Sequence, residues 1–152
     1  MKIIIGTAQL GLKYGITNKK GKPSTEESLS IIKKAVENNI FTFDTARAYG
    51  NSEYILGIAL KKFNKIKIIT KLDTLSNLNE KSTKKDIFEM IDKSIKESCN
   101  NISIDVIDTL LLHRFNHYEN KIIWNYLLSK KIETKNNKKK IKKLGVSIYN
   151  VT

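Results

Sequence analysis

The sequence predicts an α/β protein whose strands form a parallel sheet. Short runs rich in β-branched residues alternate along the chain with longer segments whose apolar residues recur at helical spacing. The alternation gives about five strands and four helices in 152 residues. This pattern is typical of βα units, in which a helix carries the chain back so that the next strand runs parallel. A chain of this length is normally one domain, so residues 1–152 are expected to share a single core.

A long polar loop separates the first predicted strand from the first predicted helix. Lys2–Thr7 is a short β-branched run and is expected to be a buried strand. Gly11–Pro23 contains several glycines and the only proline of the chain, which predict a loop. Ser24 is an N-cap candidate because Glu27 follows at the spacing of a capping box. The helix is expected to end near Asn38-Asn39.

The second βα unit carries a short loop between its strand and its helix. Ile40–Thr45 is predicted to be the second strand, and Ala46–Gly50 the loop after it. Asn51 or Ser52 can cap the second helix, which has apolar residues at helical spacing. Ile66–Thr70 is another short apolar run and is expected to be the third strand.

The remaining elements repeat the same alternation. Thr83 followed by Asp86 resembles a capped helix start, and apolar residues at helical spacing come after it. Ile104–Leu112 is expected to hold the fourth strand, and Tyr118–Ser129 the fourth helix. Lys143–Ser147 is predicted to be a short fifth strand.

Two architectures fit five parallel strands joined by helices: an open doubly wound sheet, or the opening part of an eight-stranded barrel. The sequence after the first strand, Gly6-Thr7-Ala8-Gln9-Leu10-Gly11, lacks the glycine spacing of a dinucleotide-binding turn. No G-K-[ST] sequence occurs either, so a P-loop is absent. The missing phosphate loops favour the barrel.

The formal net charge of +13 is compatible with binding to nucleic acid. Nearly all of it is lysine, with Arg47 and Arg114 the only arginines, whereas recognition of phosphate and guanine favours arginine. Lys138–Lys143 is the densest basic run, and no aromatic residue interleaves it, so base stacking is not expected there. We expect no nucleic-acid partner. A non-catalytic basic binding module that uses this run stays open as an alternative.

The sequence does not predict a membrane or secreted protein. No apolar run approaches the ~20 residues that a bilayer span needs, and the apolar stretch in Met1–Gly6 is too short for a secretory signal. Cys99 is the only cysteine, so no intrachain disulfide can form. We therefore expect a cytoplasmic protein with no bound metal.

Polar residues end three successive predicted strands. Asp44, Lys71 and His113 each close an apolar run, and Tyr49 lies in the loop after the second strand. Because parallel strands end at the same rim of a sheet, the four side chains are expected to converge. Taken singly, each residue has an ordinary explanation as a cap, a surface charge or a packing group. Four polar groups aimed at one rim instead predict a proton-transfer site.

The residue types suggest how such a site would work. A phenol with an unperturbed pKa of about 10 is a poor acid near neutral pH unless a cation stabilises its anion. Lys71 is the candidate cation for Tyr49, and Asp44 is its candidate counter-ion. His113 could orient a carbonyl oxygen beside the phenol.

The chain also resembles the aldo-keto reductase family. The matching segments occur in family order: Gly6-Thr7-Ala8, Phe43-Asp44-Thr45-Ala46-x-x-Tyr49-Gly50-x-Ser52-Glu53, Thr70-Lys71, Leu111-Leu112-His113 and Leu144-Gly145-Val146-Ser147. The resemblance implies a partial (β/α)8 TIM barrel and NADPH-dependent reduction of a small carbonyl compound. It implies that Tyr49 is the general acid, completed by Asp44, Lys71 and His113. It also implies cofactor contacts, which fall on Gly6, Thr7, Ala8 and Ser147.

The sequence departs from the family pattern in two ways. Ile148 follows Ser147, where family members often have asparagine. A full barrel needs about 200 residues or more, so we expect an N-terminal portion truncated after strand five. The family's later strands supply most of the groups that hold the cofactor, so impaired or no activity is expected for this portion alone. A partner-completed half-barrel is the alternative, since an unpaired fifth strand leaves an exposed sheet edge.

Overall fold

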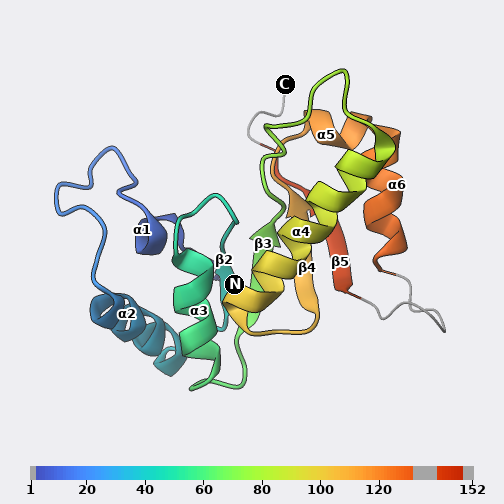
Figure 1. Ribbon diagram of the computed structural model, residues 1–152. Coiled ribbons are helices and arrows are strands. Elements are labelled where there is room, and N and C mark those ends of the chain that lie inside the picture. Colours follow the sequence, from blue (N-terminus) through green and yellow to red (C-terminus); the bar gives the residue numbers. More distant parts are fainter. Residues whose placement is uncertain (1–2, 132–139, 149–152) are drawn as a thin grey trace.

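The computed structural model describes residues 3–131 and 140–148, which form one sheet of five parallel strands covered by helices (Figure 1). The strands are β1 (Ile5–Gly6), β2 (Thr42–Asp44), β3 (Lys67–Lys71), β4 (Ile107–Leu112) and β5 (Ile141–Val146). They lie side by side in chain order. A doubly wound sheet would reverse this order at a switch point. The fold is therefore part of a (β/α)8 barrel, as predicted.

Four longer helices and two single-turn helices accompany the sheet in the described residues. They are α1 (Ala8–Gly11), α2 (Thr25–Glu37), α3 (Ser52–Leu60), α4 (Lys84–Ile102), α5 (Asn116–Glu119) and α6 (Lys121–Ser129). The longer helices form a chain of neighbours, because α2 contacts α3, α3 contacts α4, and α4 contacts α6. Figure 1 shows α2 and α3 on the side of β2, and α6 beside β5.

Both predicted helix caps are confirmed, and each is a capping box. Ser24 Oγ accepts a hydrogen bond from the amide of Glu27 at 3.1 Å, and the Ser24 amide donates to Glu27 Oε2 at 2.7 Å. Thr83 and Asp86 form the same reciprocal pair at the start of α4. At α3, Asn51 is the N-cap residue, but its side chain makes no capping bond. Asn51 Oδ1 instead accepts a hydrogen bond from Lys22 Nζ at 2.7 Å.

The first and last strands differ from the predicted ranges. β1 contains only Ile5 and Gly6, because these are the residues that pair with β2. The predicted loop is preceded by the single turn α1, which ends at Gly11. β5 begins at Ile141, earlier than predicted, because Ile141 pairs with Ile107 of β4. Residues 132–139, in the long polar segment before β5, lie outside the described part of the chain.

Three further boundaries differ by a few residues. β2 and β4 are shorter than predicted, because neither Ile40 nor Ile104 lies within the paired residues. The predicted fourth helix is two helices, α5 and α6, which meet at Asn120. The side chain of Asn120 accepts hydrogen bonds from the amides of Ile122 and Ile123 and so caps α6.

Two clusters of buried apolar side chains join the sheet to its helices. One cluster lies between β2, β3 and the helices α2 and α3, and includes Phe43 and Ile68. The other lies between β4 and the helices α4 and α6, and includes Leu110 and Leu112. Each of these four side chains is at most 1% exposed, and burying a side chain of this size contributes roughly 1.5–3 kcal/mol. Side chains alternate between the two faces of a strand, so the strand residues next to these four in sequence face the other side of the sheet.

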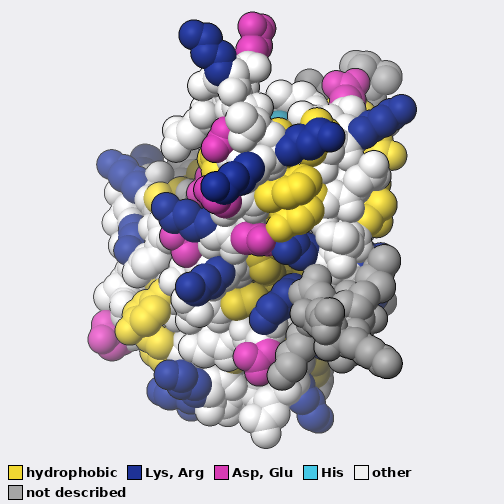
Figure 2. Space-filling view, turned by 45° about the vertical axis from the view of Figure 1, so that its right-hand side comes forward, with side chains coloured by type: hydrophobic (Ala, Val, Ile, Leu, Met, Phe, Trp, Pro, Cys, Tyr) yellow, Lys and Arg dark blue, Asp and Glu magenta, His cyan; other side chains and the backbone are white. Residues whose placement is uncertain are grey.

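On the face of the molecule that Figure 2 shows, charges of both signs are mixed. Figure 2 shows lysine and arginine side chains spread over one face of the molecule, with aspartate and glutamate between them. Of the predicted basic run, Lys138 and Lys139 lie outside the described residues. Lys142 Nζ is 2.7 Å from Asp108 Oδ1, so part of the run has a local counter-ion. Within residues 3–131 and 140–148, none of the helices combines the length and apolar character that crossing a bilayer requires.

Candidate active site

The strand ends bring the predicted polar residues to one rim. Asp44 is the last residue of β2 and lies level with Ile69 of β3. Lys71, two positions further on, ends β3 level with Leu111 of β4. His113 again follows two positions later, directly after β4. Because each strand is staggered by two residues against the last, Asp44, Lys71 and His113 share the same inward face.

Lys71 is a buried cation that is paired with a carboxylate. Its side chain is 5% exposed and forms an ion pair with Asp44, whose side chain is 30% exposed. Lys71 Nζ also donates a hydrogen bond to the carbonyl oxygen of Thr45 at 3.0 Å. A buried ammonium is tolerated when it is paired and hydrogen-bonded in this way. The predicted role of Asp44 as counter-ion to Lys71 therefore agrees with their geometry.

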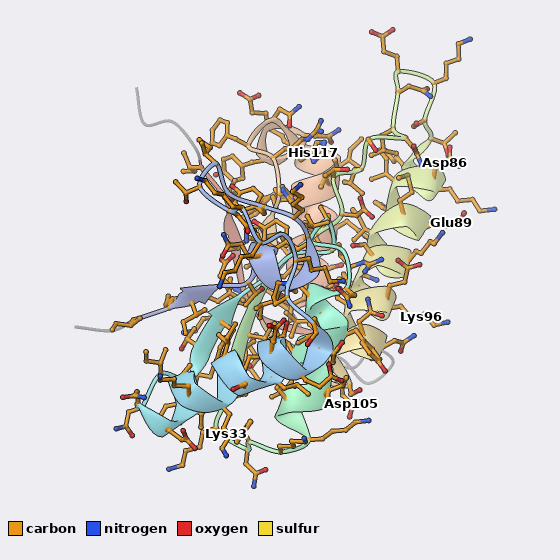
Figure 3. All side chains as sticks on the ribbon, turned by 90° about the vertical axis from the view of Figure 1, so that its left-hand side faces the viewer. Lys33, Asp86, Glu89, Lys96, Asp105 and His117 are labelled. Atoms are coloured by element: carbon orange, nitrogen blue, oxygen red, sulfur yellow. The ribbon has the colours of Figure 1, made fainter. Side chains whose placement is uncertain are left out.

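Tyr49 lies beside both Lys71 and His113. Lys71 Nζ is 5.0 Å from the centroid of the Tyr49 ring. The rings of Tyr49 and His113 have centroids 6.2 Å apart and are nearly perpendicular, at 83°. The three residues predicted from the strand ends and the loop residue Tyr49 thus form one group on the rim. Figure 3 labels His117, in α5 after β4, at this end of the molecule, and Lys33 and Asp105 towards the opposite end.

His113 is an uncharged imidazole at neutral pH. Burial lowers its pKa below the usual value of 6.5, and the positive charges of Lys71 and Arg114 lower it further. His113 Nδ1 is buried and has no hydrogen-bond partner among the described residues. A neutral imidazole has one N–H to donate and one nitrogen to accept. It can therefore orient an oxygen atom on the rim without adding a charge.

Close backbone packing fixes the loop that carries Tyr49. A Cβ atom on Gly11 would lie 1.7 Å from the carbonyl oxygen of Tyr49, so only glycine fits there. Gly50 has φ +56°, and a Cβ on it would lie 2.4 Å from the carbonyl oxygen of Gly11. The amide of Ser52 donates to the Tyr49 carbonyl at 3.0 Å. These contacts hold the Tyr49 peptide between α1 and the start of α3.

Three buried hydroxyl groups are linked by hydrogen bonds to one another and to the backbone of Asp44. Thr45 Oγ1 donates to Ser52 Oγ at 3.0 Å, and Ser52 Oγ donates to Thr7 Oγ1 at 2.7 Å. Thr7 Oγ1 in turn donates to the carbonyl oxygen of Asp44 at 2.9 Å. Ser52, expected only as a helix cap, instead ties the residues directly after β1 and β2 to the start of α3.

The predicted cofactor residues lie at the two edge strands of the described sheet, β1 and β5. Gly6 ends β1, Thr7 is fully buried, and Ala8 begins α1. Ser147 follows β5 at the same rim, where its amide donates to the carbonyl oxygen of Leu112 at 2.9 Å. Ser147 and His113 therefore directly follow two neighbouring strands, β5 and β4.

Sequence reasoning assigned no role to Glu53, which the structure places at the centre of a polar cluster. Glu53 is 1% exposed. Its carboxylate accepts hydrogen bonds from Thr70 Oγ1 at 2.7 Å, Arg47 Nη1 at 3.1 Å and Asn101 Nδ2 at 3.3 Å. One signal was available in the sequence: Glu53 shares a helix face with Leu56, and a carboxylate on an apolar face needs buried partners.

Comparison with known proteins identifies the family. The model of the aldo/keto reductase family matches residues 2–152. A candidate aldo-keto reductase from Pseudomonas aeruginosa is 23% identical with a TM-score of 0.74, over 96% of this chain and 55% of the other. An aldo-keto reductase from Bacillus halodurans, in its holo form, is 22% identical with a TM-score of 0.67, over 96% and 45%.

A third similar structure is an aldo/keto reductase from Klebsiella pneumoniae in complex with NADP and acetate. It is 16% identical with a TM-score of 0.68, over 97% of this chain and 46% of the other. The chain thus spans about half the length of the solved structures it matches. Likeness at these identities shows the fold, and the family match covers nearly every residue. The chain belongs to the aldo/keto reductase family.

Proposed function

We propose that this chain carries the proton-delivery part of an NADPH-dependent carbonyl reductase, with Tyr49 as the proton donor. The observation that carries the proposal is the position of Lys71 Nζ, 5.0 Å from the centroid of the Tyr49 ring, while Lys71 is also paired with Asp44. Family membership supports an oxidoreductase of this class. The substrate class is a small molecule with an aldehyde or ketone group.

Each side chain on the rim has a separate role in the protonation of a carbonyl oxygen. Tyr49 donates its phenolic proton as the oxygen becomes an alkoxide. The ammonium of Lys71 stabilises the phenolate that remains, and its ion pair with Asp44 holds that ammonium in place. His113, uncharged at neutral pH, orients the carbonyl oxygen next to the phenol. NADPH, when bound, supplies the hydride that adds to the carbonyl carbon.

The rim fits the nicotinamide end of such a cofactor. Ser147 directly follows β5, next to the end of β4 that precedes His113, and a serine hydroxyl can bond the carboxamide of a nicotinamide. Gly6, Thr7 and Ala8 border the rim at its other side. His113 Nδ1 is a buried polar atom without a partner among the described residues, as expected where another molecule completes the site. The similar Klebsiella pneumoniae structure holds NADP.

The polypeptide of 152 residues, taken alone, is proposed to hold NADPH weakly. It spans about half the length of its solved relatives, and the resemblance to the family implies that later strands supply most of the groups that hold the pyrophosphate and adenosine. Fluorescence titration of the purified chain with NADPH should give weak or no binding. Micromolar affinity together with turnover of a simple aldehyde would contradict this part of the proposal.

A completed barrel tests the reductase function itself. Residues 1–148 would be joined to the part of the Pseudomonas aeruginosa relative that this chain does not cover, and the product is called the completed barrel below. NADPH oxidation with simple aldehydes should then appear at 340 nm. Folding is checked by circular dichroism and a single thermal transition. A folded completed barrel that binds NADPH and reduces none of a panel of aldehydes and ketones would overturn the proposed function.

A further inference from the structure

Arg47 lies between two carboxylates on the outer side of the rim. Its Nη1 is 3.1 Å from Glu53 Oε2, and its Nη2 is 2.6 Å from Glu97 Oε2. Burial works against the charged guanidinium, but the two carboxylates outweigh it, so the pKa of Arg47 is raised. The side chain of Arg47 therefore stays charged and bridges α3 to α4.

The bridge is connected to both members of the Tyr49–Lys71 pair. Arg47 is two positions before Tyr49, in the same loop, and its amide donates to the carbonyl oxygen of Lys71 at 3.3 Å. On the other side, Glu53 accepts a hydrogen bond from Thr70, the residue directly before Lys71. The cluster thus contacts the loop of Tyr49 and the end of β3 at the same time.

The electrostatics favour one discrete arrangement of this cluster. A buried carboxylate without partners is strongly destabilising, so Glu53 favours conformations that keep its three donors in place. Arginine is suited to this role because its planar fork engages two carboxylates at fixed angles. A lysine in its place would supply the charge without the fork.

We infer that Arg47, clamped by Glu53 and Glu97, is a positioning residue that sets the distance between the Tyr49 ring and Lys71. The inference rests on the proposed function, because that distance matters to proton delivery. Displacements of about 1 Å at a reacting group can lower rates by a factor of about 100. Arg47 acts through Tyr49 and is not itself assigned a contact with substrate.

The test measures geometry in the 152-residue chain and needs no turnover. Nuclear Overhauser effects between the Tyr49 ring and the Lys71 side chain report their separation, and amide exchange at Arg47 and Tyr49 reports opening of the loop. Arg47→Met should weaken those Overhauser effects at least twofold. It should also raise exchange at the two amides at least tenfold more than at Leu72, whose amide bonds Leu111 between β3 and β4.

Two further variants separate positioning from general destabilisation. Glu97→Gln removes one arm of the clamp at a side chain that is 39% exposed, and should give the same local changes to a smaller degree. Arg47→Lys should restore less than half of the lost Overhauser intensity. Glu89→Gln is the matched control. Like Glu97, Glu89 is an α4 carboxylate, but it pairs with Lys85, and both of these side chains are exposed.

Equal exchange increases at Arg47, Tyr49 and Leu72, or unchanged Tyr49–Lys71 Overhauser effects in Arg47→Met, would overturn the inference. Its failure is distinct from failure of the proposed function. An inactive completed barrel with the expected Overhauser losses would reject the reductase function and leave Arg47 as a positioning residue. An active completed barrel, together with unchanged Overhauser effects in Arg47→Met, would support the reductase function and reject Arg47 as a positioning residue.

Discussion

Gly11 and Gly50 are in backbone contact next to the Tyr49 loop, and neither site has room for a side chain. Gly11→Ala should displace the Tyr49 peptide, because the new Cβ would meet its carbonyl oxygen at 1.7 Å. We expect the free energy of unfolding to fall by about 1–3 kcal/mol, the usual cost of overpacking, as measured by urea unfolding. Gly6→Ala is the control, with no atom within 4 Å of the added Cβ. Equal effects of the two substitutions would contradict the packing account.

The two histidines should make stability depend on pH. Burial and the charge of Arg114 lower the pKa of both His113 and His117 below 6.5 in the folded protein. The unfolded chain therefore binds more protons below pH 6.5, so stability is full above that pH and is lost as pH falls through the folded pKa values. Urea unfolding at pH 7.5 and 5.5 should show lower stability at pH 5.5.

His117→Gln provides the control for this pH effect. Without the His117 imidazole, the difference in unfolding free energy between pH 7.5 and 5.5 should shrink, while part of it remains because His113 still titrates. Carboxylates with lowered pKa, such as Asp86, titrate below this window. A wild-type protein of equal stability at both pH values would refute the lowered pKa of these half-buried histidines.

Among the elements, the capped helix starts are governed by local interactions. Ser24→Ala removes the acceptor for the Glu27 amide at the start of α2. The free energy of unfolding should fall by about 0.5–2 kcal/mol, measured by thermal or urea unfolding. Ser30→Ala, at an exposed position of the same helix, should change stability little or raise it slightly, since alanine is the better helix former. A cap substitution no worse than Ser30→Ala would argue against the capping box.

This locality explains what the sequence could predict. The caps at Ser24 and Thr83 depend on residues three positions apart, and the convergence of Asp44, Lys71 and His113 depends only on strand ends meeting at one rim. The partners of Glu53 could not be predicted in this way, since Thr70 and Asn101 lie 17 and 48 positions away. The start of β5 was missed for a similar reason, because Ile141 is in the strand through its pairing with Ile107.

At the scale of the whole molecule, the described sheet has two edges, β1 and β5, each paired on one side only. Ile3 and Ile4, just before β1, are 49% and 47% exposed. Exposed strand edges with apolar side chains tend to associate, so we propose that the 152-residue chain self-associates through them. Sedimentation velocity should show a weight-average mass that rises with concentration. Ile3→Lys with Ile4→Lys should reduce that rise, and a monomer at all concentrations would contradict the proposal.

Proton delivery by Tyr49 is tested by the kcat of the completed barrel with and without the phenolic hydroxyl. Tyr49→Phe should lower kcat at least 100-fold, in line with the usual contribution of a positioned general acid, with an unchanged thermal midpoint. Tyr54→Phe, at a side chain that is 57% exposed, should leave kcat within twofold. A Tyr49→Phe variant as active as the parent would contradict the account.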